Sequence, residues 1–181
     1  MKTTSPIKSK TKKQSSRQRA PERAQAGAAP PVPKRILVPV DFSEFSDQAL
    51  QYALRLAREF KAKLFLLHVV EAFPIDYVLG IKAAEEANRR QLDQRESRLR
   101  KVADRLTAEH SISASASVSF GKPFQQIVQF AGIHDIDLIV IATHGYTGLK
   151  HIQLGSTAEM VVRHSTCPVL VLPNPDRRQA T

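Results

Sequence analysis

Apolar side chains between residues 34 and 173 fall into two alternating patterns. Short uninterrupted runs rich in Val, Ile and Leu are typical of strands that are buried on both faces. Longer stretches in which apolar residues recur every three to four positions are typical of amphipathic helices. The predicted strands are 35–40, 62–70, 111–120, 136–142 and 167–173. The predicted helices between them are 43–60, 82–109, 124–133 and 156–164.

The first two predicted helices differ in the width of their apolar face. Ser43 or Ser46 can cap the amino end of the first helix, where two acidic residues complement the helix dipole. Its expected buried face consists of Ala49, Tyr52, Ala53, Leu56 and Phe60. The second helix is longer and highly charged, with a narrow apolar stripe at Leu92, Leu99, Val102, Ala103 and Leu106.

Two of the predicted strands have features of sheet edges. In 111–120 apolar residues alternate with serines, which predicts one wetter face and a position near an edge. The strand 167–173 is apolar at consecutive positions but comes last in the chain. An exposed apolar edge is a template for association unless something covers it, so we expect either a partner chain or a shielded monomer.

The order of elements predicts the fold class. Strands that alternate with helices indicate an α/β protein, a five-stranded parallel sheet with helices on both faces and right-handed crossovers. Ligands of such sheets bind beyond the carboxyl ends of the strands, where the strand order reverses. We therefore expect the functional site at Asp41, which follows the first strand, and at residues 142–145, which follow the fourth.

The stretch "IATHGYTGLKHIQLGST", residues 141–157, connects the fourth strand to the last helix and contains three glycines. Helix-start amides attract anions, glycines let a backbone approach a phosphate closely, and Ser156 and Thr157 add hydroxyl donors. Neither a G-x-x-x-x-G-K-[ST] loop nor a G-x-G-x-x-G motif occurs. Spacing alone therefore leaves two interpretations open, a phosphate-binding loop and an ordinary connection.

Charge is concentrated at the amino terminus. The chain has 181 residues and a formal charge of +10, and residues 1–35 hold ten Lys or Arg and one Glu, or +9. Residues 1–33 have almost no large apolar side chains and are predicted to be a disordered basic tail. We expect this arm to be a solubilising extension, a polyanion-binding segment or a transit peptide. Residues 34–173 form the predicted domain and 174–181 a short tail.

The remaining composition narrows the class of protein. No apolar stretch has the roughly 18–20 residues that span a bilayer, and no secretory signal pattern follows the basic start. The single Cys167 excludes an internal disulfide and is expected to be a packing residue. The expectation is a cytoplasmic protein without membrane contact.

The histidines do not predict a metal site, because none has H-E-x-x-H or C-x-x-C spacing. We expect His68 to be partly buried and hydrogen-bonded, and His164 to lie at a helix end. His144 either touches a ligand or hydrogen-bonds its own loop. A hydrolase built from Ser43, His144 and Asp41 lacks a G-x-S-x-G elbow, so no catalytic residue is predicted.

Three stretches of the chain resemble the universal stress protein family: "ILVPVDFSEFSDQAL", "GKPFQQIV" and "THGYTGLKHIQLGSTAEMVVRHSTCPVLVLP". The ATP-binding branch of that family has G-x-x-G, nine residues, then G-[ST]. Gly145, residues 146–154 and Gly155-Ser156 match its later part, whereas Ala142 stands at the first glycine. A negative backbone φ at Ala142 would accommodate the methyl group. If the site needs a positive φ, or if the methyl group meets the ligand, the cost is on the order of 1 kcal/mol or more.

The resemblance implies a Rossmann-like sandwich similar to the adenine-nucleotide alpha-hydrolases. It also implies ATP or another adenine nucleotide, accompanied by Mg²⁺, and a homodimer formed through strand 167–173. The nucleotide-binding residues that it implies are Pro39, Val40, Asp41, Val69, Ile141, Ala142, Gly145, Gly155, Ser156 and Thr157.

Two functions follow from this reading and stay open on the sequence alone. The first is a nucleotide-dependent regulatory module of the stress response, with at most slow ATP hydrolysis because no base, arginine finger or metal cage is evident. The second is an interaction protein that binds no nucleotide and works through its dimer surface and its basic arm. Ala142 favours the second, whereas Asp41 and the Gly155-Ser156 pair favour the first.

Overall fold

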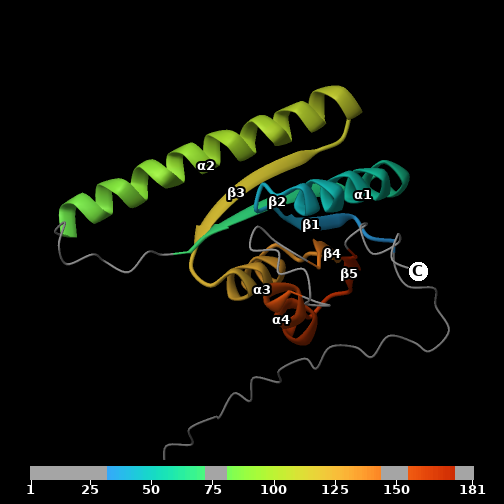
Figure 1. The fold of residues 1–181 in the computed structure, drawn as a ribbon. Coiled ribbons are helices and arrows are strands. Elements are labelled where there is room, and N and C mark those ends of the chain that lie inside the picture. The colour runs from blue at the N-terminus through green and yellow to red at the C-terminus, as the bar shows by residue number, and fades with distance from the viewer. Residues whose placement is uncertain (1–31, 72–80, 144–154, 174–181) are drawn as a thin grey trace, which may run out of the picture. The chain divides into compact units, whose positions relative to one another are not determined.

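The computed structural model describes residues 32–71, 81–143 and 155–173, which form an α/β sandwich (Figure 1). Strands and helices alternate along the chain, as the hydrophobic pattern predicts. The strands are β1 Arg35–Pro39, β2 Lys63–Val70, β3 Ala114–Phe120, β4 Leu138–Ala142 and β5 Val169–Leu172. The helices are α1 Glu44–Phe60, α2 Ile81–His110, α3 Pro123–Ile133 and α4 Ser156–His164.

All five strands pair in parallel, in the order β3-β2-β1-β4-β5. The predicted fold class is thus confirmed, and β3 and β5 are the two edges. The strand order reverses between β1 and β4, which are neighbours in space although two helix–strand units separate them in the chain. Their register pairs end at Leu37 and Ile139, whereas β1 stays paired with β2 through Pro39. A crevice can therefore open between the carboxyl ends of β1 and β4.

Each face of the sheet has its own buried core. On the first face, strand residues such as Ile36 and Leu66 pack with α1 and α2. On the second face, residues such as Leu37 and Ile139 pack with α3 and α4. Figure 1 shows these helix pairs on opposite sides of the strands. Because side chains alternate along a strand, neighbouring residues of β1 serve different cores.

Helix α1 begins after an N-cap that the sequence left open between two serines. Ser43 is the cap: its backbone is extended and its Oγ accepts a hydrogen bond from the Ser46 amide at 3.2 Å. The predicted buried face is wrong in one position, since Tyr52 is 42% exposed. The buried residues of α1 are Ser46, Ala49, Leu50, Ala53, Leu54 and Ala57. The buried face of α1 is centred on Ala49, Ala53 and Ala57, which pack in the core with the strands. It therefore includes Leu50 and Leu54 on one side of these alanines and excludes Tyr52 on the other.

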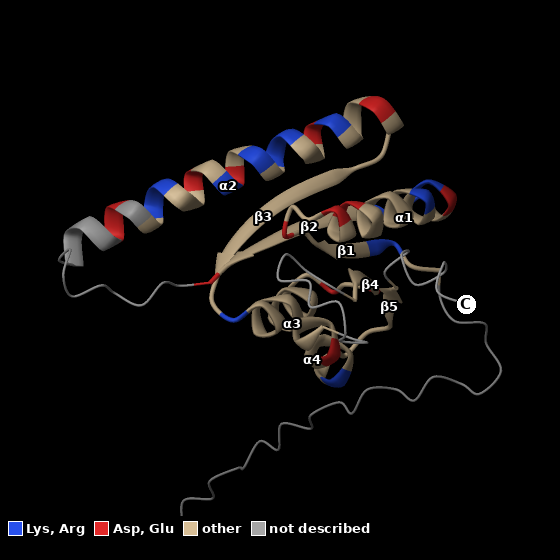
Figure 2. Cartoon of the chain, in the orientation of Figure 1, with Lys and Arg blue, Asp and Glu red and all other residues tan. Residues whose placement is uncertain are grey.

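Helix α2 confirms four of the five residues of the predicted apolar stripe; Leu92 is half-buried but is not part of the core. Leu99, Ala103 and Leu106 are buried in the first-face core, and Val102 packs against it. Lys and Arg alternate with Asp and Glu along the helix (Figure 2). Its exposed ion pairs include Arg100–Glu96, with 3.2 Å between Nη2 and Oε1. Such pairs contribute little to stability, so α2 is held mainly by its narrow stripe.

Several strands are shorter than predicted. β3, β4 and β5 begin at Ala114, Leu138 and Val169, each two or three residues after the predicted start. The missing residues lead into the sheet before regular pairing begins; Ser113, for example, uses its carbonyl for the Leu64 amide. Apolar composition continues into these lead-in residues, so a pattern of side chains cannot mark where the ladder starts. The predicted tails, 1–33 and 174–181, and residues 72–80 fall almost wholly outside the described residues.

Candidate functional site

A pocket of about 260 Å³ lies at the carboxyl ends of β1 and β4, where the strand order reverses. Its volume is close to the lower end of the range for small-molecule sites, roughly 300–1,000 Å³. The predicted site residues that line it are Pro39, Val40, Asp41, Val69, Ile141, Ala142, Gly155, Ser156 and Thr157. Gly145, together with His144, falls outside the described residues. The fold therefore brings together in one pocket every predicted site residue that the structure describes.

Thr143, within the predicted stretch 142–145, also lines the pocket. The lining residues that were not predicted are Ser46, Leu67, Glu71, Pro123, Ile127 and Ala158. Glu71 directly follows β2, and Pro123 begins α3 just after β3. The rule that drew attention to Asp41 applies equally to these positions, because all parallel strands end at the same side of the sheet. Glu71 adds a second carboxylate to the wall of the pocket.

Asp41 is half-buried and held by the turn that leads into α1. Its Oδ1 accepts hydrogen bonds from the Ser43 amide at 3.0 Å and from the Ser43 hydroxyl at 2.5 Å. Ser43 in turn caps α1, so the carboxylate, the turn and the helix start are connected by hydrogen bonds. An ionised carboxylate accepts hydrogen bonds through two oxygens, which is the chemistry that ligand hydroxyls require.

Phe42, between these two residues, has an uncommon backbone conformation with φ of 63°. This left-handed region costs an L-residue roughly 1–2 kcal/mol. The Phe42 ring centroid lies 4.7 Å from the His68 ring, and the Arg98 guanidinium carbon lies 4.0 Å from the same centroid. The ring thus connects β2 and α2 to the turn that carries Asp41, and its contacts stabilise the strained backbone.

His68 is buried, as expected, and its ring Nδ1 donates a hydrogen bond to the Val40 carbonyl at 2.7 Å. Burial lowers the pKa of His68 below its ordinary value, and the positive charge of Arg95 acts in the same direction. The hydrogen bond to Val40 and the charge of Asp41 oppose this shift without cancelling it. The imidazole is consequently neutral at neutral pH and fixes the strand end beside the pocket.

Ala142 has an ordinary strand backbone, since it belongs to β4 and is not among the residues with positive φ. Its side chain packs against the first-face core, while the residue also lines the pocket. The backbone at this position therefore does not require glycine. Any effect of the methyl group must come from the space that it takes from a ligand.

The amino end of α4 forms another wall. The Gly155 amide donates to the Thr143 carbonyl at 2.6 Å, so the end of β4 and the start of α4 are joined directly. Gly155 is the N-cap and has no side-chain cap, and its φ of −63° is accessible to any residue. The first-turn amides of a helix have no partner within the helix and carry partial positive charge. Ser156 and Thr157 present this end of α4 to the pocket.

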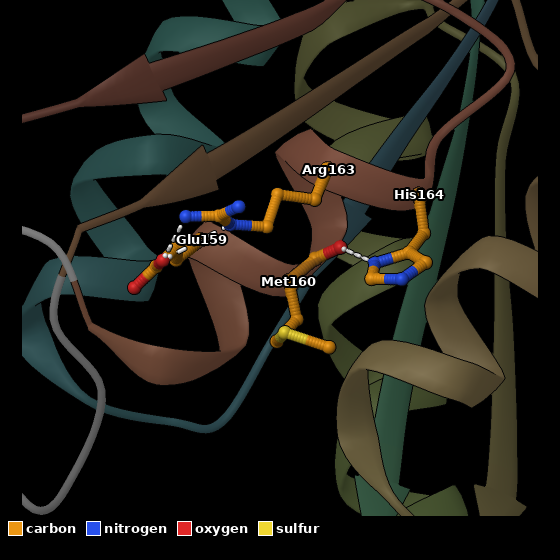
Figure 3. A network of polar contacts seen from close by, with 4 residues as sticks. All are labelled: Glu159, Met160, Arg163 and His164. Atoms are coloured by element: carbon orange, nitrogen blue, oxygen red, sulfur yellow. Dashed lines mark hydrogen bonds and ion pairs between the residues drawn. The ribbon is translucent and has the colours of Figure 1, made fainter.

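The rest of α4 is held by local contacts (Figure 3). Arg163 Nη2 lies 2.9 Å from Glu159 Oε1, and both side chains are exposed. His164 Nδ1 donates to the Met160 carbonyl at 2.8 Å, which confirms the predicted helix-end role of this histidine. The exposed Glu159 also follows the helix start closely enough to complement its dipole.

Three further features concern metal binding, membrane-spanning helices and the cysteine. Within the described ranges, no cluster of three or more His, Cys, Asp or Glu side chains is arranged to hold a metal ion. None of the helices described there is long and apolar enough to cross a membrane. Cys167 is a free thiol and packs against the second-face core, as predicted.

Comparison with known proteins gives the family. The family model for the universal stress protein family matches residues 33–173. Universal stress protein MJ0531 of Methanocaldococcus jannaschii is 33% identical over 144 residues, which are 80% of this chain and 84% of that protein. Universal stress protein YxiE of Bacillus subtilis is 31% identical, over 76% of this chain and 97% of its own length. The chain belongs to the universal stress protein family.

Solved structures agree with this assignment. The universal stress protein UspA from Lactobacillus plantarum superimposes with a TM-score of 0.69 at 28% identity, covering 77% of this chain and 97% of that chain. A universal stress protein solved in complex with cAMP superimposes with a TM-score of 0.56 at 24% identity, covering 79% and 98%. The second likeness shows a shared fold.

Proposed function

We propose that this universal stress protein is a regulatory module that binds an adenine nucleotide, with ATP as the ligand. The observation that carries the proposal is the composition of the pocket at the switch point. The carboxylate of Asp41 after β1, apolar strand ends and the positive end of α4 converge on one hollow. These are the groups that a nucleoside, with its hydroxyls, base and phosphates, would need.

Each part of the ligand has matching chemistry in the pocket. Val40, Val69 and Ile141 offer apolar surface for the base, and Asp41 offers an acceptor for ribose hydroxyls. Gly155 and the two hydroxyl residues after it would hold phosphates at the start of α4, together with Gly145. Mg²⁺ would arrive with the triphosphate and keep most of its ligands from phosphate and water. Bound ATP would place its phosphate charge at the start of α4.

Two facts are consistent with an adenine nucleotide. The backbone of Ala142 does not require glycine, which removes the conformational part of the objection raised by the altered glycine motif. A protein with the same fold has been solved with cAMP, which makes adenine nucleotides the first class to test. We expect regulation by occupancy and slow hydrolysis at most.

Calorimetric titration of the full chain with Mg-ATP tests the proposal. Asp41→Ala should weaken binding about tenfold, because it removes one charge-assisted contact. Gly155→Val should abolish binding by placing side-chain atoms at the helix start. Ala142→Gly should leave affinity unchanged or raise it up to about tenfold.

The basic arm is a source of unspecific triphosphate binding, so every variant keeps it. Arg163→Ala serves as the matched control, because it removes a charge from α4 on its exposed side. Equal binding by wild type, Asp41→Ala and Gly155→Val would show that the arm alone binds ATP and would refute the proposed site. Binding gained only in Ala142→Gly would favour the alternative, a protein that binds no nucleotide.

We also infer a homodimer formed through residues 167–173. β5 is an edge strand, and all four of its apolar residues are only half-buried within one chain. Light scattering should give twice the chain mass of 20.1 kDa. Leu170→Lys should yield monomers, whereas Val162→Lys, on an exposed apolar residue of α4, should not. A wild-type monomer at all concentrations would contradict this inference.

The remaining proposals concern location and the arm. A cytoplasmic location agrees with the free thiol of Cys167, since reducing compartments keep thiols unpaired. A polyanion contact by residues 1–35 rests on charge alone. Binding of a nucleic acid through this arm should weaken steeply with salt and disappear in a chain that begins at residue 34.

A further inference from the structure

A second hollow, of about 430 Å³, lies at the opposite end of the sheet from the nucleotide pocket. It lies on the second face of the sheet, next to α3, and is lined by the first residues of β1 and β2. The residues that line it are Arg35, Lys63, Phe65, Ser115, Ser117, Phe130 and His134. We call it the Arg35–Lys63 pocket. It shares no lining residue with the nucleotide pocket.

Two cations stand side by side in this pocket. Arg35 and Lys63 are register partners on neighbouring strands, which lie roughly 4.8 Å apart, and they share a face with Phe65. The Arg35 guanidinium carbon is 5.3 Å from the Phe65 ring centroid, and Lys63 Nζ is 4.9 Å from it. Like charges directly opposite each other on a sheet are destabilising, so this pair needs a compensating negative charge.

Among the residues that the structure describes, no carboxylate forms an ion pair within 4.0 Å with Arg35 or Lys63. The Asp137 carboxylate is nearby, but its Oδ2 accepts from the backbone amides of Lys34 and Arg35, at 2.8 and 2.9 Å. It therefore anchors the backbone at the start of β1. The attraction of the Phe65 ring only partly offsets the repulsion between the two cations.

Arg35 has a further unmet requirement. Its Nε is buried and has no hydrogen-bond partner. Buried donors are nearly always paired in folded proteins, and a guanidinium presents its N–H groups in a planar fork that matches oxyanions. An oxyanion in the pocket would neutralise both cations and give this guanidinium the acceptor that the protein does not supply.

The other side of the pocket offers polar groups that suit the same ligand. Ser115 and Ser117 present hydroxyls from β3; the Ser115 hydroxyl makes only a long contact, 3.5 Å, to the Leu64 carbonyl. The His134 ring is held by stacking, with its centroid 4.0 Å from that of Phe130. Hydroxyl and imidazole groups therefore line the same hollow as the two cations.

We propose that the Arg35–Lys63 pocket binds a phosphoryl oxyanion, either inorganic phosphate or a phosphate monoester. Arg35 and Lys63 supply the charge, and Ser117 and His134 donate hydrogen bonds to the remaining oxygens. A tetrahedral dianion fits this arrangement better than a planar carboxylate, because the donors come from two sides of the hollow rather than from one plane. The site is independent of nucleotide binding and belongs to the opposite end of the strands.

The test is an NMR titration of the ¹⁵N-labelled full chain with sodium phosphate and, separately, with glycerol phosphate. We expect saturable shifts of the amides of Lys63, Ser117 and His134. Lys63→Gln should weaken binding about tenfold, because one charge-assisted contact is lost. Lys63 is exposed, so this variant keeps the fold, which its dispersed spectrum verifies. Tighter binding of glycerol phosphate would identify a monoester as the ligand, and equal binding would identify phosphate itself.

Arg58→Gln is the matched control, because Arg58 is an exposed cation in the last turn of α1 outside the pocket. Equal weakening in Lys63→Gln and Arg58→Gln would overturn the proposal, since it would mean diffuse charge screening. Shifts that grow without saturation would do the same. Shifts confined to Gly155, Ser156 and Thr157 would assign the phosphate to the nucleotide pocket and would also overturn it. These outcomes differ from a failure of ATP binding, which the calorimetry measures separately.

Discussion

Replacing Phe42 by glycine and by alanine separates the two roles of this residue, which are its ring contacts and its backbone conformation. Both variants lose the contacts with His68 and Arg98. A fully buried Phe→Ala change costs about 3–5 kcal/mol, and Phe42 is half-buried, so we expect the ring loss to cost about 2 kcal/mol in either variant.

The backbone term then distinguishes the variants. At φ of 63° alanine keeps a strain of roughly 1–2 kcal/mol that glycine does not have. Glycine loses about 0.5–1 kcal/mol more entropy on folding. The net expectation is that Phe42→Gly is more stable than Phe42→Ala by about 0.5–1 kcal/mol.

Urea unfolding, followed by circular dichroism, measures this difference. With a slope of about 2 kcal/mol per molar, the midpoint of Phe42→Gly should be roughly 0.3–0.5 M higher. Gln48, exposed within α1, provides the matched pair, where glycine should be less stable than alanine by about 1 kcal/mol. If glycine were also the less stable residue at position 42, the strained turn beside Asp41 would not exist and the reasoning would fail.

Three further predictions concern stability. The pKa of His68 is lowered in the folded state from its ordinary value of 6.5. Below pH 6.5 this histidine therefore binds more protons in the unfolded chain than in the folded protein. Stability should therefore fall as the pH drops from about 6.5 towards the folded pKa, and His68→Asn should flatten this part of a thermal-unfolding pH profile; an unchanged profile would contradict the lowered pKa. Leu66→Ala, at a fully buried position in β2, should cost about 2–5 kcal/mol in urea unfolding, and a loss below about 1 kcal/mol would contradict its place in the core. Arg163→Ala should cost less than about 1 kcal/mol in the same assay, because its ion pair with Glu159 is exposed; a larger loss would show that this pair is structural.

The order and type of every helix and strand could be read from the chain because local periodicity reports them directly. Alternation of strands and helices also restricts the topology to a parallel sheet. The sequence alone therefore predicts a site at the carboxyl ends of β1 and β4. Asp41 and Ala142 were found in this way, and Glu71 and Pro123 could have been.

Helix α1 shows where periodicity stops being informative. The sequence has alanines at 49, 53 and 57, which lie on one face of the helix. The apolar residues on either side of this face, Leu50 and Tyr52, are equally compatible with the pattern. Only the position of the sheet decides that Leu50 is buried and Tyr52 is exposed. The same limit applies to strand starts, because a residue belongs to the ladder only when a neighbouring strand pairs with it.

Contacts between distant segments lay beyond the sequence altogether. Hydrophobic pattern and turn chemistry act over a few residues, so they determined the elements, their order and the end of the sheet where a ligand would bind. The stacking of Phe42 between His68 and Arg98, and the pairing of Arg35 with Lys63, join residues about 26–56 positions apart. No local signal marks such pairs, because they exist only after the strands have found their neighbours and the helices have packed on them. Tertiary structure alone therefore decided the strained turn beside Asp41 and the second pocket.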